Sequence, residues 1–369
     1  MKKRKRLRVA YIAFDSAEYP IRLASALAQE IDVHLVLPQI ELTPHHQWLD
    51  AAVHVHAYDR PRFREPLKQM RMIRSLLRCL KQIAPDVIHL HQGHMWFNLA
   101  LPWLKQYPLV VTIKDPIFHV GDRESRKTPQ AIIHFGFKRA DQIVVHNQPM
   151  KQMAIEACGL REDSISVVPL IERGDGGAQK QVAEEGNQIL FFGRIWKYKG
   201  LEYLIRAEPL ISAQVPDTKI VIAGSGDDFA PYRRMMVHPE RFVVHNEFVS
   251  YAKRAELFRR ASIVVLPYIE ATQSGVIPVA YTYEKPVIAT SVGGLPEQLE
   301  HGHTGFLVPP RDVQALADCA VRLLRDETLR RRLGANGKRK ADTEWSANAV
   351  AQKILPVYHR AREANKAPS

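Results

Sequence analysis

Short apolar runs recur along the first half of the chain, and helix-like stretches separate them. Runs that are apolar throughout, rather than alternating with polar residues, are typical of parallel strands that helices cover on both faces. The first 172 residues are therefore predicted to form one doubly wound, Rossmann-like α/β domain. The predicted strands of this domain cover residues 8–14, 33–37, 86–91, 109–113 and 143–146.

The alternation stops at residues 173–187, which are polar and rich in glycine, as expected of an interdomain linker. A second Rossmann-like domain is predicted over residues 188–343, because the same alternation then resumes. The last segment, 344–369, is predicted to contain a helix that crosses back to the first domain. Predicted strands of the second domain cover residues 189–192, 219–223, 262–266 and 286–290.

Composition supports a globular protein of two domains, since the 369 residues are 46% hydrophobic and 25% charged. The three cysteines, Cys79, Cys158 and Cys319, lack the spacing of a metal knuckle or a disulfide framework. No apolar run approaches the roughly 20 residues that span a bilayer, and the basic N-terminus leads into a strand rather than a signal-peptide core. We expect a cytoplasmic protein.

The net charge of +13 favours anionic partners, such as phosphate-bearing substrates, anionic lipid surfaces or nucleic acid. Nucleic acid is not expected as a partner, because no recognition motif or aromatic stacking platform is present. One helix-like segment carries Lys68, Arg71, Arg74, Arg78 and Lys81 beside an apolar stripe of Met70, Ile73, Leu77 and Leu80. We expect the stripe to pack on the sheet; the alternative is peripheral contact with an anionic membrane.

Residues that follow strands of the second half could hold a diphosphate, because doubly wound sheets bind ligands beyond their carboxyl ends. Gly193 and Arg194 follow the first of these strands, and Lys199 comes just before the next helix. A planar guanidinium and an ammonium suit a diphosphate, although both could equally be solvated surface charges. Gly224 follows the second strand in a glycine turn, which alone is a weak signal.

The segment 267–278 follows an apolar strand and precedes helix-like sequence. The backbone N–H groups of residues 273–276 are expected to face outward at the start of that helix, where anions bind. These residues are Gln273, Ser274, Gly275 and Val276. Glu270 would repel phosphate, so it is expected to accept hydrogen bonds from sugar or ribose hydroxyls; the simpler alternative is a turn or capping carboxylate.

In the first half, Asp115 and His119 follow the strand at 109–113. A histidine there could donate a hydrogen bond to a sugar hydroxyl or a departing phosphate oxygen, although a surface-loop histidine is the alternative. Three further histidines, His89, His91 and His94, lie close together, but no nearby carboxylate or cysteine completes a metal set. No metal is therefore expected, and His91, His94 and Asp115 become candidates for the acceptor side.

In this order, the segments resemble glycosyltransferase family 4, the retaining GT-B enzymes that use nucleotide-sugar donors. The resemblance covers nearly the whole chain, and its most specific motifs are 192–194 with 199–200, 223–226, 286–297 and 305–310. It implies a GT-B fold of two Rossmann-like domains and a hexosyltransferase-type activity. It also implies no cofactor other than the nucleotide-diphosphate sugar donor, because cationic side chains replace a divalent metal.

The resemblance also implies roles for individual residues. Arg194 and Lys199 would hold the donor diphosphate, the backbone of residues 273–276 would add N–H groups, and His119 would contact the donor sugar. Stabilisation of charge on the leaving diphosphate would then be the main catalytic effect.

Three features depart from the family pattern. The usual pair of glutamates is incomplete, because Ala271 and Val279 stand at the two positions. Glu270 could replace the first glutamate by a shift of one residue, but nothing evident replaces the second, which normally binds ribose. The glycine-rich first loop is replaced by residues 15–20, and Lys114 stands where histidine is common.

These observations support three hypotheses about function. The first is an active transferase that moves a sugar to a glycan or lipid-linked acceptor, in cell-envelope polysaccharide synthesis. The second is a non-catalytic nucleotide-sugar-binding or scaffold subunit, suggested by the missing glutamate. The third is a nucleotide-sugar epimerase, which would convert the donor with no acceptor present.

Overall fold

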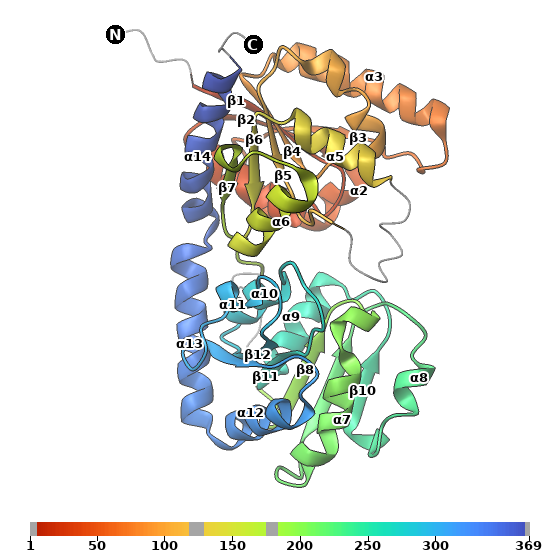
Figure 1. Ribbon diagram of the computed structural model, residues 1–369, viewed down its shortest axis with the longest axis vertical. Coiled ribbons are helices and arrows are strands. Elements are labelled where there is room, and N and C mark those ends of the chain that lie inside the picture. The colour runs from red at the N-terminus through yellow and green to blue at the C-terminus, as the bar shows by residue number, and fades with distance from the viewer. Residues whose placement is uncertain (1–5, 118–128, 175–183, 366–369) are drawn as a thin grey trace. The chain divides into compact units, whose positions relative to one another are not determined.

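The computed structural model describes residues 6–117, 129–174 and 184–365 (Figure 1). The described chain divides into two compact units, each built on one parallel sheet. Unit 1 contains the residues up to Ile117, those from 129 to Ile171 and those from Ser346 onward, and unit 2 contains residues 172–174 and 184–345. The predicted fold class, two doubly wound parallel-sheet domains, is confirmed.

The sheet of unit 1 has the strand order β3-β2-β1-β4-β5-β6-β7, and every neighbouring pair is parallel. The chain therefore reverses its direction of progress between β1 and β4, and such switch points are where doubly wound sheets bind ligands. All five predicted strands are present. The strands are β1 (Arg8–Ala13), β2 (Asp32–Pro38), β3 (His54–Tyr58), β4 (Val87–His91), β5 (Leu109–Thr112), β6 (Gln142–Val145) and β7 (Ile165–Val167).

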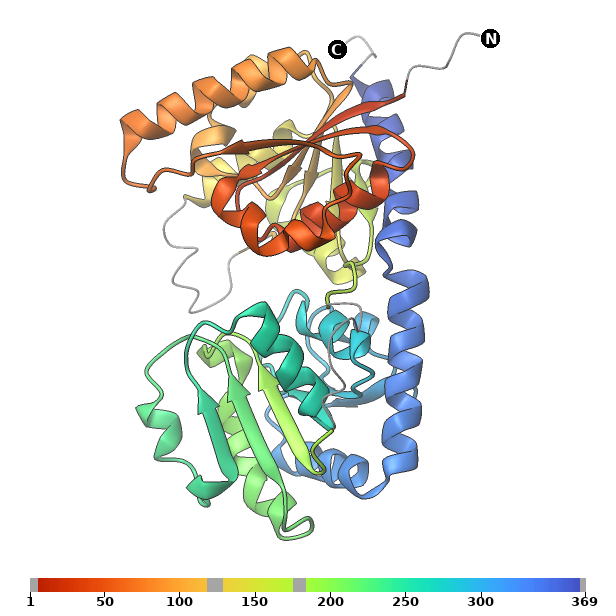
Figure 2. The same cartoon turned by 180° about the vertical axis from the view of Figure 1, so that it is seen from behind.

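Helices cover both faces of this sheet (Figures 1 and 2). One core lies between the sheet and α1 with α14, and the other lies between the sheet and α3 to α6. The C-terminal helix α14 packs against α1, β4, β5 and β6 and so belongs to unit 1. The helices are α1 (Glu18–Leu27), α2 (Gln39–Leu42), η1 (Thr43–Trp48), α3 (Pro66–Ile83), α4 (Met95–Asn98), η2 (Leu101–Leu104), α5 (Gln130–Arg139), α6 (Gln148–Cys158), η4 (Glu162–Ser164) and α14 (Ala347–Ala364).

Unit 2 repeats the design with the strand order β10-β9-β8-β11-β12-β13, and its switch point lies between β8 and β11. Helices α7 and α12 cover one face, and α9 and α10 cover the other. The strands are β8 (Gln188–Phe192), β9 (Lys219–Ala223), β10 (Phe242–His245), β11 (Ile263–Leu266), β12 (Val287–Thr290) and β13 (Gly305–Val308). The helices are η5 (Lys197–Lys199), α7 (Leu201–Ser212), α8 (Ala230–Arg233), η6 (Pro239–Arg241), α9 (Tyr251–Arg260), α10 (Val276–Thr282), α11 (Leu295–Gln298), α12 (Val313–Arg325) and α13 (Glu327–Glu344).

Helix α3 differs from its prediction in the face that it buries. The residues that it buries are Gln69, Met72, Leu76, Leu80 and Ile83, so only Leu80 of the predicted stripe is fully covered. Met70 is 42% exposed, while Ile73 and Leu77 are half-buried. The reason is that α3 carries two apolar stripes, a first one of Met72, Leu76 and Ile83 and a second one of Met70, Ile73 and Leu77. The stripes lie about 100° apart, and only one of them can face the sheet fully.

Among the described helices, none is both long enough and apolar enough to cross a membrane.

Candidate functional site

Two glycines bring the ends of β8 and β9 into contact at the carboxyl edge of unit 2. Gly193 has φ 129° and its N–H donates to the Ala223 carbonyl over 3.0 Å, while Gly224 has φ 148°. A Cβ on Gly224 would collide with the Gly193 carbonyl oxygen. Only glycine allows the two backbones to come this close. The edge is therefore lined by backbone without side chains, which leaves room for a bulky anion.

The cationic side chains of this edge are supported by aromatic rings. The Arg194 guanidinium carbon lies 3.9 Å from the centre of the Trp196 ring, and Lys199 Nζ lies 3.7 Å from the centre of the Tyr268 ring. Tyr268 is fully buried just after β11, so its ring is a fixed platform. Stacking on rigid rings restricts both cations before any ligand arrives.

The turn after Lys199 is locked onto the loop that follows β11. Gly200 has φ 62°, and a side chain there would collide with the Pro267 carbonyl. The Ile269 N–H donates to the Tyr198 carbonyl over 2.8 Å. The structure thus brings Gly193, Arg194 and Lys199 together with the loop from Tyr268 to Gly275, at the switch point of unit 2.

The Ser274 and Val276 N–H groups, which were predicted to bind an anion, donate to partners inside the protein. The Ser274 N–H donates to Gln298 Oε1 over 2.8 Å, and the Val276 N–H donates to Ser274 Oγ over 3.2 Å. Gly275 caps α10, which has only seven residues. A short helix has a small dipole, so the charged side chains of this edge contribute more of the positive potential than the helix does.

The two family glutamate positions lie in the core of unit 2. Ala271 and Val279 are 6% and 3% exposed and belong to one hydrophobic cluster. A carboxylate at position 279 would lose its hydration, which is unfavourable. Val279 fills this position instead and packs within the hydrophobic cluster. Glu270, which directly precedes Ala271, is half-buried, and its N–H lies 3.4 Å from the Tyr198 carbonyl oxygen.

One arginine of this edge was missed by sequence reasoning. A Cβ on Gly275 would lie 3.0 Å from Arg173 Nη1 and 3.6 Å from its Cζ. Arg173 Nε is buried and has no hydrogen-bond acceptor among the described residues. Arg173 was assigned to the linker because glycines and charges follow it; the only sequence signal is its place just after the apolar run that ends at Ile171.

The predicted acceptor-side residues lie at the carboxyl ends of the neighbouring strands β4 and β5. His91 ends β4, is buried, and lies with its Nδ1 3.2 Å from the Tyr11 hydroxyl. His94 stacks on Phe14 with ring centres 4.6 Å apart, and burial lowers the pKa of His94 to about 4. Asp115 follows the neighbouring strand β5. His119 lies outside the described residues.

Two of the departures from the family pattern contact each other at this edge. Lys114 Nζ lies 2.7 Å from Asp15 Oδ1, so the lysine in the usual histidine position pairs with the altered first loop. Burial raises the pKa of Asp15, but the Lys114 ammonium outweighs burial and holds that pKa below its usual value. The two changes form one ion pair across β1, β4 and β5.

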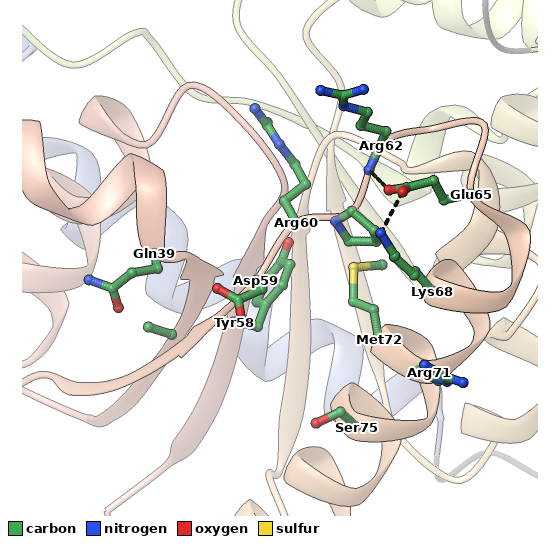
Figure 3. Close-up of a pocket in the computed structure, with 12 residues that line it drawn as sticks. Gln39, Tyr58, Asp59, Arg60, Arg62, Glu65, Lys68, Arg71, Met72 and Ser75 are labelled. Atoms are coloured by element: carbon green, nitrogen blue, oxygen red, sulfur yellow. Dashed lines mark hydrogen bonds and ion pairs between the residues drawn. The ribbon is translucent and has the colours of Figure 1, made fainter.

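A cavity of about 990 Å³ lies near the carboxyl end of β3 and the start of α3 (Figure 3). Arg60 in its wall donates to the Phe14 carbonyl over 2.8 Å, and Glu65 Oε1 accepts from Lys68 over 2.6 Å. Arginines and lysine outnumber the carboxylates in the wall, so an anionic group would be favoured there. The charged lining residues are Asp59, Arg60, Arg62, Glu65, Lys68 and Arg71.

Comparison with known proteins gives two family matches, each covering much of one unit. Residues 17–170 match glycosyltransferase family 4, and residues 186–326 match the glycosyl transferases group 1. An uncharacterized glycosyltransferase of Methanocaldococcus jannaschii is 33% identical over 297 residues, covering 75% of this chain and 76% of that protein.

A second relative is the phosphatidyl-myo-inositol mannosyltransferase of Mycobacterium leprae, which is 28% identical over 291 residues and covers 74% of this chain and 73% of its own. Among solved structures, Anabaena HepE in complex with UDP and glucose superposes with a TM-score of 0.71 at 16% identity, covering 95% of this chain and 98% of its own. At that identity the superposition shows the shared fold.

Proposed function

Because the chain belongs to the family of group 1 and family 4 glycosyltransferases, we propose that it is a retaining, hexosyltransferase-type enzyme with a nucleoside-diphosphate sugar as donor. The observation that carries this proposal is the convergence of bare glycine backbone, Arg194 and Lys199 at the switch point of unit 2. The UDP complex of HepE supports a nucleoside diphosphate as the ligand.

The proposed catalytic effect is stabilisation of the leaving diphosphate. Negative charge grows on its oxygens as the bond to the sugar breaks, and two oriented cations lower the energy of that state. Arg194 offers a planar fork and Lys199 a point charge, and their aromatic platforms reduce the reorganisation that each needs. These cations take the role that a divalent metal has elsewhere, so we propose transfer without a metal or another cofactor. His119 and Glu270 are proposed to contact sugar hydroxyls.

The test begins with binding. Purified protein is titrated with UDP, GDP and ADP, and we expect one of them to raise the melting temperature, because a ligand of the folded state stabilises it. Arg194→Gln and Lys199→Gln should each lower the transfer rate by a factor of 10² or more, the usual loss for one transition-state donor. Arg206→Gln, an exposed site on α7, is the matched control. If none of the three nucleotides binds, the proposal is contradicted.

A non-catalytic donor-binding subunit is the second candidate, favoured by the burial of Val279 at the position of the ribose-binding glutamate. Turnover separates the two functions. Donor binding without transfer to lipid-linked acceptors extracted from cells would favour the subunit.

We further propose that unit 1 contacts an anionic membrane surface at the cytoplasmic face through the second apolar stripe of α3. This stripe lines a groove of about 770 Å³ opposite Trp96, Leu99 and Trp103, and Leu99 and Trp103 are 47% and 69% exposed. Exposed tryptophan and leucine flanked by cations are typical of surfaces that lie on lipid. Arg74 and Lys81 flank the groove. A lipid-linked or envelope glycan acceptor fits this placement, as the name of the Mycobacterium leprae relative suggests.

Co-sedimentation tests the membrane contact. We expect binding to vesicles that contain phosphatidylglycerol and little binding to phosphatidylcholine alone. Arg74→Gln with Lys81→Gln should weaken binding, because each cation near an anionic surface contributes about 1 kcal/mol, or roughly fivefold. Trp103→Ser should weaken it through lost apolar contact, while Arg161→Gln on another exposed surface should not. Equal binding to both vesicle types would remove the proposal.

A further inference from the structure

Three potential metal ligands converge at the edge of the unit 1 sheet, where β2 and β3 begin. The two strands pair in parallel with His34 opposite His54, and Asp32 lies two residues before His34 on the same face. His34 Nε2 lies 3.4 Å from Asp32 Oδ1, and His54 Nε2 lies 3.4 Å from the same oxygen. All three ligand atoms lie within 4.8 Å of one another.

We infer that Asp32, His34 and His54 form a binding site for a zinc ion. Zinc takes imidazole nitrogen and carboxylate oxygen ligands at about 2.0–2.2 Å in tetrahedral geometry, which places neighbouring ligand atoms roughly 3.3–3.5 Å apart. Both distances to Asp32 Oδ1 have this value before any ion enters. The ligands stand on paired strands, so the backbone is already in place. The His34 and His54 rings are stacked with their centres 4.7 Å apart, so side-chain rotation has to turn the two Nε2 atoms towards one ion.

Two of the ligands have the outer partners that orient metal-binding side chains. His34 Nδ1 lies 2.9 Å from His56 Nε2, which leaves His34 Nε2 facing Asp32 and His54. Asp32 Oδ2 accepts from Arg8 Nε over 2.7 Å, which leaves Oδ1 for the ion. Arg8 is itself fixed, since it donates to the Ile83 carbonyl over 3.1 Å. Such outer contacts set ligand orientation and contribute to metal affinity.

Solvent reaches the site, as a metal ion and its remaining ligand require. A cavity of about 330 Å³ is lined by Arg8, Asp32 and His54, and the His54 side chain is 63% exposed. Water from this cavity can fill the fourth coordination position. The positive charge of Arg8 opposes a cation, so we expect micromolar rather than nanomolar affinity. A zinc ion here would tie β3, the edge strand of the sheet, to β2.

The inference is independent of the proposed transferase function and is tested by calorimetry. The full chain, free of any histidine tag and freed of metal with a chelator, is titrated with ZnCl₂ and with MgCl₂. We expect one zinc site and no magnesium binding. His34→Gln and His54→Gln should each weaken zinc binding at least tenfold, while His46→Gln, an exposed histidine of the same unit, should not.

Cobalt substitution provides a second measurement. Co²⁺ in the wild-type site should give the visible absorption of a four-coordinate ion, and His54→Gln, which changes an exposed side chain and should leave the fold intact, should abolish it. Absence of zinc binding in the wild-type protein would overturn the inference. Equal affinity in His34→Gln, His54→Gln and His46→Gln would also overturn it, because binding would then come from scattered surface histidines.

Discussion

At the residue scale, the donor edge of unit 2 depends on a few side chains whose freedom is removed by their neighbours. Glycines at 193, 200 and 224 allow backbones to approach where any Cβ would collide or be strained. Aromatic rings hold Arg194 and Lys199. Arg173 differs from them, because its buried Nε has no acceptor among the described residues. A buried donor without an acceptor is costly, and Nη1 of the same guanidinium lies beside Gly275 at the donor edge.

We therefore expect Arg173 to contact the bound diphosphate, an expectation that rests on the proposed function. Arg173→Gln should weaken binding of the preferred nucleoside diphosphate by a factor of about 10 to 150, since a hydrogen bond to a charged group contributes about 1.5–3 kcal/mol. Gly275→Ala should also weaken it, because the added Cβ would stand 3.0 Å from Arg173 Nη1. Arg332→Gln, an exposed arginine of α13, is the matched control. Calorimetry measures the affinities, and unchanged affinity in Arg173→Gln would exclude this contact.

At the element scale, what the sequence could predict follows from burial on both faces. The nine predicted strands are central in their sheets or covered by helices, so they appear as continuous apolar runs. The four edge strands, β3, β7, β10 and β13, were not predicted. Exposed or half-buried residues, such as His54 and His56, interrupt the apolar pattern of β3 and β10, and β7 and β13 are short runs of three and four residues. The face of α3 was predicted only in part: Leu80 is buried and Ile73 and Leu77 pack partly against the same core, but α3 buries Met72, Leu76 and Ile83 more deeply. Two apolar stripes compete for one sheet, and packing volume decides between them.

The candidate site could be predicted where its residues follow a visible strand, but not where they depend on contacts between distant parts of the chain. Gly193, Arg194 and Lys199 come directly after a visible strand, and strand order brings them to the switch point. The contact between Lys114 and Asp15 could not be predicted, because the two residues are distant in sequence and meet only through the pairing of β1, β4 and β5. The partners of the Ser274 and Val276 N–H groups were equally hidden: Gln298 reaches the Ser274 N–H from α11, and the Ser274 hydroxyl reaches the Val276 N–H within its own turn.

At the scale of the whole molecule, the chain closes unit 1 with its own C-terminal helix. After leaving unit 1 at Ile171, the chain returns at Ser346, and α14 then packs on α1 and the central strands. His89 of β4 joins this packing: its Nδ1 lies 2.9 Å from the Tyr358 hydroxyl of α14, and its Nε2 lies 2.7 Å from Thr112 Oγ1. A fully buried histidine thus joins β4 to α14, and burial lowers the pKa of its imidazole far below neutral pH.

Acid should destabilise unit 1 through this histidine. Burial, with a smaller effect of nearby His146, lowers the pKa of His89 from 6.5 to about 3. Between these values the unfolded chain binds a proton that the folded chain does not, so the contribution of neutral His89 is complete above pH 6.5 and is lost as pH falls towards 3. At pH 5 the loss is about 2 kcal/mol, from 1.36 kcal/mol for each pH unit below 6.5.

Hydrogen exchange of peptides from β4 and α14, corrected for the intrinsic rate at each pH, measures this effect. In zinc-free buffer we expect the opening free energy of these peptides to fall between pH 7.5 and pH 5. His89→Gln should be less stable at pH 7.5 but should show a smaller fall, because glutamine has no proton to bind in this range. His46→Gln, which changes an exposed side chain of the same unit, should retain the full fall. If the opening free energy fell equally in His89→Gln and in wild type, the acid sensitivity would come from other groups. The contact of His89 with α14 would then not govern the stability of unit 1.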